Sequence, residues 1–139
     1  PGGDLIHVKV ATQDSGGALF MTEQPTERRG SGPPKHYHEE QDEWFYCLAG
    51  EYVVEIGDQR FRLGPGESVL GPRRVPHAFA YDGPGPGRIL IGFTPAVRIE
   101  QFFRDLEKRG QYFGTGSTED KDLAHRLYGI VNVGPPLKL

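Results

Sequence analysis

Hydrophobic and polar positions alternate over short runs in the first two thirds of the chain, up to about residue 94. Such runs, bounded by glycine, proline and aspartate, predict β-strands separated by tight turns. We expect strands over residues 5–10, 18–22, 35–38, 44–48, 52–56, 60–63, 68–70, 77–81 and 88–93. Gly57-Asp58 suits a hairpin turn, whereas the glycine- and proline-rich segments 64–66 and 82–87 are expected to end strands rather than continue them.

In the last third of the chain the period of the pattern changes. One helix is expected where apolar residues recur at i, i+3, i+4 and i+7, at Ile99, Phe102, Phe103 and Leu106. Gly110 is its expected C-terminal cap. A second helix is expected over residues 119–128, with Ser117 or Thr118 as the N-cap and Gly129 after its end. The remaining segment is expected to be extended and to cover a sheet edge.

Many short strands without intervening helices indicate an all-β protein, an antiparallel sandwich or barrel. The 139 residues are enough for one domain. We expect residues 1–95 to form the β-barrel and residues 96–139 to form a helical extension packed on it within the same domain. An amphipathic helix has to bury its apolar face against something, and the barrel is the available surface.

Composition and charge exclude several classes of function. The net charge is −3 and the pI is about 6.0, and the short pair Arg73-Arg74 is no basic patch, so nucleic-acid binding is not expected. No apolar run approaches the roughly 20 residues that span a bilayer. The single cysteine, Cys47, excludes an intrachain disulfide. With no visible signal peptide, we expect a cytoplasmic protein.

Three histidines and one glutamate have the spacing of a metal site. His36 and His38 share one face of a predicted strand. A polar turn follows, so Glu43 would return beside them, and His77 would close the site from a distant strand. This nitrogen–oxygen set suits one divalent transition metal ion, Fe, Mn, Ni, Zn, Co or Cu, without discriminating among them. His7 and His125 lack such a pattern and are expected to be ordinary residues.

The same residues resemble the two motifs of the cupin superfamily. The first motif is a glycine, five residues, His-x-His, three or four residues, a glutamate, six residues and a glycine. It is matched at every fixed position by Gly30, His36, His38, Glu43 and Gly50. The second motif is matched by Gly66, Pro72 and His77, whereas Arg74 replaces its second glycine and Tyr81 replaces its asparagine.

The resemblance implies a small antiparallel jelly-roll barrel with a short C-terminal helical tail. The chain is similar to small single-domain cupins of the quercetin-dioxygenase-like kind at Gly16-Gly17, at Asp42-Glu43 and over residues 76–79. This similarity implies the scaffold and the metal more than a reaction. The leading hypothesis is a metal-dependent dioxygenase acting on a small aromatic or enol-type molecule, and the resemblance implies that Glu43 is both a metal ligand and the base that takes the substrate proton. A homodimer is expected by analogy with other cupin barrels.

Two other classes of function remain open for the same ligand set. One is a non-oxidative metal-dependent isomerase, lyase or decarboxylase. The other is a non-catalytic metal-containing module that binds a small molecule. A metal-free sugar-nucleotide epimerase is less expected, because those barrels use a histidine and tyrosine pair.

Alternate residues of a strand point to the same face of the sheet, which suggests side chains that could line the pocket. Phe45 and Cys47 share the parity of Glu43, and Phe79 and Tyr81 share the parity of His77. Each of the four is expected either to touch a bound ligand or to pack in the core. Arg73 and Arg74 could attract an acidic substrate near the pocket mouth, although a plain surface pair is the simpler interpretation.

Overall fold

The computed structural model describes residues 6–109 and 117–139 as strands, two α-helices and one short 3₁₀ turn (Gln13–Ser15). The strands are β1 (His7–Val10), β2 (Phe20–Thr26), β3 (Pro34–His38), β4 (Asp42–Ile56), β5 (Gln59–Leu63), β6 (Ser68–Gly71), β7 (His77–Thr94) and β8 (Ile130–Pro136). The helices are α1 (Ile99–Arg109) and α2 (Thr118–Tyr128).

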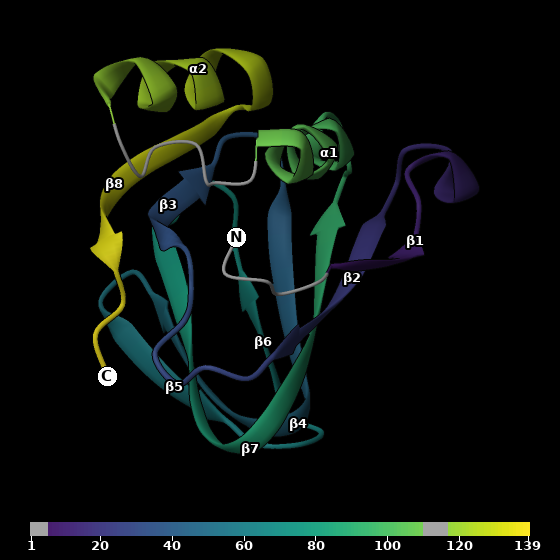
Figure 1. The fold of residues 1–139 in the computed structure, drawn as a ribbon. Helices are drawn as coiled ribbons and strands as arrows, with labels where there is room; N and C mark the ends of the chain where they lie inside the picture. The colour runs from purple at the N-terminus through teal and green to yellow at the C-terminus, as the bar shows by residue number, and fades with distance from the viewer. Residues whose placement is uncertain (1–5, 110–116) are drawn as a thin grey trace.

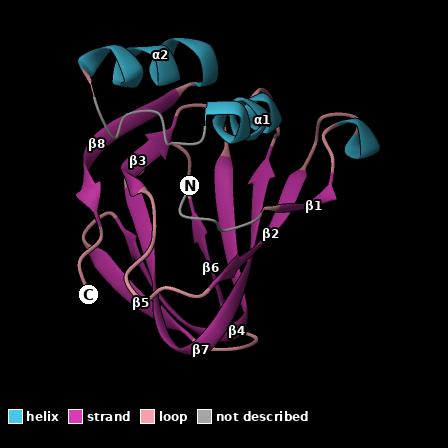
Figure 2. Ribbon diagram, viewed as in Figure 1, coloured by secondary structure: helices cyan, strands magenta, loops and turns pink. Residues whose placement is uncertain are grey.

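All strand pairs are antiparallel, as the alternating pattern predicts. One path through the sheet runs β1-β2-β7-β3-β8, and β4 pairs with β5, β6 and β7. The sheet curls into a barrel, with the two helices over the end where β3 and β8 lie (Figure 1). The fold is therefore the all-β jelly-roll that the sequence predicted, and it carries two helices on one side (Figure 2).

Two strands are much longer than predicted. Residues 44–48 and 52–56 belong to the single strand β4, and residues 77–81 and 88–93 belong to the single strand β7. The expectation that 82–87 forms a turn outside the sheet was wrong. The ladder shifts there, from the pair Ala49↔Arg88 to the pair Glu51↔Gly83, so the extra glycines and prolines are taken up as a bulge. Each strand thus serves both halves of the barrel.

The helices begin and end close to where the sequence places them. The Ser117 hydroxyl accepts a hydrogen bond from the Asp120 N–H over 3.2 Å, and Gly129 adopts a left-handed conformation after α2. The expected cap Gly110 lies outside the described residues. Neither helix among the described residues has the length and apolar character required to cross a membrane.

The apolar face of α1 is buried against the barrel. Ile99, Phe102 and Leu106 are buried with the residues of the main core. The ring of Phe103 packs 5.7 Å from Phe93 of β7, measured between ring centres. β8 pairs along β3, as expected for a C-terminal segment that covers a sheet edge.

Candidate metal centre

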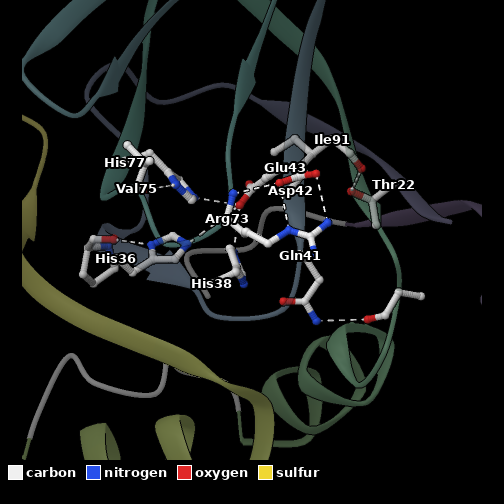
Figure 3. Close-up of polar contacts among 12 residues, drawn as sticks. Thr22, His36, His38, Gln41, Asp42, Glu43, Arg73, Val75, His77 and Ile91 are labelled. Carbon is white, nitrogen blue, oxygen red and sulfur yellow. Dashed lines mark hydrogen bonds and ion pairs between the residues drawn. The ribbon is translucent and has the colours of Figure 1, made fainter. Parts of the chain in front are cut away.

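The four predicted ligands converge although they come from three strands. His36 and His38 lie on β3, Glu43 lies at the start of β4, and His77 begins β7. His36 is the register partner of His77, which brings the distant histidine directly opposite the His-x-His pair. One ligand atom from each of the four side chains lies within 4.8 Å of the others, and Figure 3 shows the side chains gathered in one place.

The Glu43 carboxylate lies at the centre of the cluster. Its Oε1 atom is 2.8 Å from the Nε2 atoms of both His38 and His77, and 4.0 Å from Nε2 of His36. His38, Glu43 and His77 are almost fully buried. A buried carboxylate requires compensating positive charge, which here comes either from imidazolium protons or from a bound cation.

Backbone carbonyls orient two of the three imidazoles. Nδ1 of His36 lies 2.7 Å from the carbonyl oxygen of Pro34, and Nδ1 of His77 lies 3.1 Å from that of Val75. A carbonyl only accepts hydrogen bonds, so each Nδ1 carries the proton and Nε2 is the atom that faces Glu43. This is the usual arrangement by which protein metal sites fix the tautomer of a histidine ligand.

The titratable side chains of the cluster shift one another's pKa values. Burial, together with the nearby His77 and His38, lowers the pKa of His36 to about 3, so its ring is neutral at pH 7. Burial alone would raise the pKa of Glu43, but His77 and His38 outweigh it and hold that pKa well below its usual range. Burial likewise opposes the charged form of His77, yet Glu43 raises its pKa. An anionic carboxylate therefore faces the neutral ring of His36 and stabilises the protonated form of His77, and a bound cation would take over this charge compensation.

The spacing of these atoms fits a transition metal. Ligand atoms about 2.1 Å from a metal lie roughly 3 Å apart when adjacent in an octahedron and roughly 4 Å apart when opposite. The contacts of 2.8 and 4.0 Å to Glu43 Oε1 are of this size. The cluster is suited to a divalent metal ion, and its nitrogen–oxygen composition does not select one metal.

The turn before β7 is fastened to the ligand-bearing strands. Asp42 accepts hydrogen bonds from the Arg73 backbone N–H (2.8 Å) and from its guanidinium (3.2 and 3.1 Å). The sequence pattern predicted only a polar turn between His38 and Glu43 and did not indicate this contact. The positive charge of Arg73 is therefore engaged by Asp42. Arg74, which replaces the motif glycine, adopts the left-handed conformation that glycine favours (φ 67°).

A cavity opens beside the cluster, bordered by the ligands His36, His38 and Glu43. Its apolar walls are Pro33, Pro34, Phe79, Ile91, Phe93, Phe102, Phe103 and Ile130, and its other polar lining residues are Gln24 and Asn132. The cavity volume is about 30 Å³, enough for roughly two water molecules. A larger ligand therefore requires wall side chains to shift.

The predicted pocket residues divide between cavity and core. Phe79 lines the cavity. Phe45, Cys47 and Tyr81 are instead buried in the main core, where the Phe45 ring packs 5.7 Å from that of His77. Sequence reasoning did not single out Asn132 as a lining residue, because a lone asparagine in an extended segment carries no periodic signal.

The aromatic residues of the first helix were assigned to packing alone, yet Phe102 and Phe103 also line the cavity. The helical period indicated that they face the barrel but not that they line the same cavity as three of the candidate ligands. The two other histidines are away from the cluster: His7 is exposed, and His125 pairs with Glu39 over 3.2 Å.

Comparison with known families agrees with this geometry. A sequence profile of the cupin domain matches residues 26–93, which include all four candidate ligands. The chain belongs to the cupin superfamily. The part of this cupin outside the matched region holds α1, α2 and β8, so part of the cavity wall lies beyond the family-defining segment.

The similar proteins include enzymes with different reactions. The cupin is 30% identical over 104 residues to quercetin 2,3-dioxygenase of Bacillus subtilis, a match that covers 75% of this chain but only 30% of that enzyme. The polyketide cyclase RemF of Streptomyces resistomycificus is 26% identical with a TM-score of 0.55, over 66% of this chain and 64% of that one. KdgF from Halomonas sp. superposes with a TM-score of 0.60 at 23% identity, over 68% and 81% of the two chains, which shows a common fold.

Proposed function

We propose that this cupin is a metal-dependent dioxygenase that acts on a small aromatic or enol-type substrate. The observation that carries the proposal is that the four candidate ligands gather in one cluster, and that three of them, His36, His38 and Glu43, border a cavity with mainly aromatic and aliphatic walls. No lysine or arginine lines this cavity among the described residues, which disfavours phosphorylated or strongly anionic substrates. The similarity to quercetin 2,3-dioxygenase supports the oxidative chemistry.

The residues of the chain have distinct roles in this proposal. His36, His38, Glu43 and His77 would hold the metal, which supplies a Lewis acid and, if redox-active, the means of using dioxygen. The pKa of Glu43 is lowered, so the side chain is an anionic ligand at neutral pH. The proposal also makes its carboxylate the acceptor for the proton of an enol or phenol hydroxyl. The phenylalanines of the wall would hold the carbon skeleton and exclude water.

A second candidate function is non-oxidative metal-dependent chemistry such as cyclisation, isomerisation or decarboxylation. The similarity to the polyketide cyclase RemF supports it, and the same ligands and apolar walls would serve it. The two candidates differ in one measurable respect, because only the dioxygenase consumes dioxygen.

The first experiment measures metal content by elemental mass spectrometry. We expect about one equivalent of a transition metal in the wild-type protein and only traces in a His36→Ala, His77→Ala double variant. His7→Ala and His125→Ala are the matched controls, because these histidines lie away from the cluster, and both should keep the metal. If the double variant retains as much metal as the wild type, the assignment of the metal to this cluster is wrong.

The second experiment measures oxygen uptake by the metal-loaded protein with quercetin, catechol and acetylacetone as probes. We expect uptake with at least one probe in the wild type and a loss of at least a hundredfold in Glu43→Gln, since removing a general base typically costs that much. Turnover under strictly anaerobic conditions would instead establish the non-oxidative function. Probe binding without any turnover would indicate a binding module.

A further inference from the structure

The cavity contains one polar group to which the proposed function gives no role, the side-chain amide of Asn132. Asn132 lies on β8 and is the register partner of His36 on β3. Side chains directly opposite each other on antiparallel strands project from the same face of the sheet. The Asn132 amide is therefore on the same face of the sheet as the His36 ring, and both residues line the cavity.

A β-bulge fixes the register at this point. Lys35 pairs with Gly134 and the next residue, His36, pairs with Asn132, so Val133 is an extra residue on β8. Bulges re-aim neighbouring side chains and are common beside functional sites. Val133 itself is 48% exposed, so the bulge keeps this apolar side chain at the surface while Asn132 lines the cavity.

The amide nitrogen of Asn132 has no hydrogen-bond partner among the described residues, although the atom is buried. A buried donor left without an acceptor is unfavourable, and such groups are rare in folded proteins without a functional reason. The other amide of the cavity contrasts with it, because Nε2 of Gln24 donates to the Thr22 hydroxyl over 3.1 Å. Asn132 is thus the lining amide whose donor is left for a ligand.

The rest of the lining restricts what that ligand can be. Its walls are mainly phenylalanine, isoleucine and proline, and no cationic side chain lines the cavity among the described residues. A ligand acceptor that reaches Asn132 is therefore a neutral oxygen on an apolar skeleton rather than a phosphate or a free carboxylate. Because Asn132 lies opposite His36, this oxygen would be close to the ligand's other oxygen, the one that would bind the metal.

We propose that Asn132 is a substrate-binding residue that donates a hydrogen bond to a carbonyl oxygen adjacent to the ligand's enol or phenol oxygen. The inference rests on the proposed function, because it assumes that the cluster holds a metal. It narrows the substrate class to small hydroxy-carbonyl compounds, in which a hydroxyl and a carbonyl sit on neighbouring positions of an aromatic or conjugated frame.

Two probes of matched shape test this assignment. 2′-Hydroxyacetophenone carries a phenol with an adjacent carbonyl, and 2-ethylphenol has nearly the same shape without the carbonyl. Binding of each to the cobalt(II)-loaded protein is measured by calorimetry and by the visible absorption of the cobalt. The variants are Asn132→Leu, which is close in size, and Asn132→Ala in case the first does not fold. Val133→Ala is the control, since it changes β8 at an exposed position.

We expect Asn132→Leu to bind 2′-hydroxyacetophenone about tenfold more weakly, the loss of one hydrogen bond of average strength. Its affinity for 2-ethylphenol and its cobalt content should match those of the wild type. Val133→Ala should leave the affinity for both probes unchanged. Unchanged binding of the carbonyl probe in both Asn132 variants would overturn the inference. So would equal weakening of both probes, which indicates a structural role.

The metal assay separates this inference from the proposed function. Wild-type protein that takes up cobalt but binds neither probe would overturn the role of Asn132 and leave the metal site standing. Wild-type protein that takes up no cobalt would overturn both. Selective loss of the carbonyl probe in the Asn132 variants, without oxygen uptake, would support the substrate class and move the function to the non-oxidative candidate.

Discussion

The backbone N–H of Arg74 donates a hydrogen bond to the carbonyl oxygen of His38 over 2.7 Å. This contact joins the turn before β7 to the last residue of β3, so it links the segment that leads to His77 with the strand that carries the other two imidazoles. The arginine stands where the cupin motif has glycine, and its φ of 67° keeps the turn that the glycine would form.

Arg74→Gly is predicted to stabilise the protein. A left-handed conformation costs a residue with a Cβ roughly 1–2 kcal/mol, and the greater freedom of glycine in the unfolded chain offsets part of that gain. We expect the free energy of unfolding to rise by about 0.5–1 kcal/mol in denaturant titrations. Arg74→Ala keeps the strain and should bring no such gain. Equal stability of the glycine and alanine variants would contradict the explanation.

The ion pair between Asp42 and Arg73 predicts a pH dependence. Hydrogen bonds from Arg73 hold the pKa of Asp42 below its ordinary value. A carboxylate with a lowered pKa in the folded state stabilises the protein above its unfolded-state pKa, about 4, and this stabilisation is lost as the pH falls through the folded-state value. Both side chains are partly exposed, at 30% for Asp42 and 46% for Arg73, so the effect is small.

Asp42→Asn should therefore lower the free energy of unfolding at pH 7 by less than about 1 kcal/mol. The difference between variant and wild type should shrink as the pH falls from 5 to 3. Thermal unfolding of both proteins across this range measures it, and taking the difference cancels the titration of the metal cluster. A gap that stays constant down to pH 3 would show that Asp42 acts through its shape and not its charge.

Metal removal should destabilise the fold, because the ligands come from three strands. A ligand at a hundred times its Kd stabilises the folded state by about 2.7 kcal/mol. We expect EDTA to lower the Tm of the wild-type protein by several degrees. The His36→Ala, His77→Ala variant should respond little to EDTA, and a wild-type Tm insensitive to EDTA and to added metal would speak against a site in this cluster.

Gly87 is predicted to tolerate no side chain. A Cβ placed there would overlap the Cε1 atom of Tyr81 and lie 2.9 Å from the Tyr52 hydroxyl, and both tyrosines are fully buried. Overpacking of this kind typically costs 1–3 kcal/mol, so Gly87→Ala should lower the midpoint of urea unfolding clearly. Gly92→Ala is the control, because its Cβ would meet its neighbours at 3.5 Å or more; equal effects would contradict the argument.

The four candidate ligands could be predicted because their signal is local. His36 and His38 share a strand face, and Glu43 and His77 occupy fixed places in two short motifs. The continuity of β7 could not be predicted, since Gly83 and its neighbours have the composition of a turn and only pairing with β2 and β4 keeps them in the sheet. Asn132 could not be predicted either, because its place is set by pairing with a strand far earlier in the chain.

The attachment of β3 has a consequence for how the metal centre is made. β3 shares one register pair with β7, at His36, and five with β8. The strand that carries two of the four ligands is thus held mainly by the C-terminal strand. The ribosome synthesises β8 after all four ligand residues, so a nascent chain already contains every ligand before β8 can fix their positions. We therefore expect metal loading to follow synthesis and pairing of β8, and a truncation before Ile130 to leave a ligand set that does not assemble.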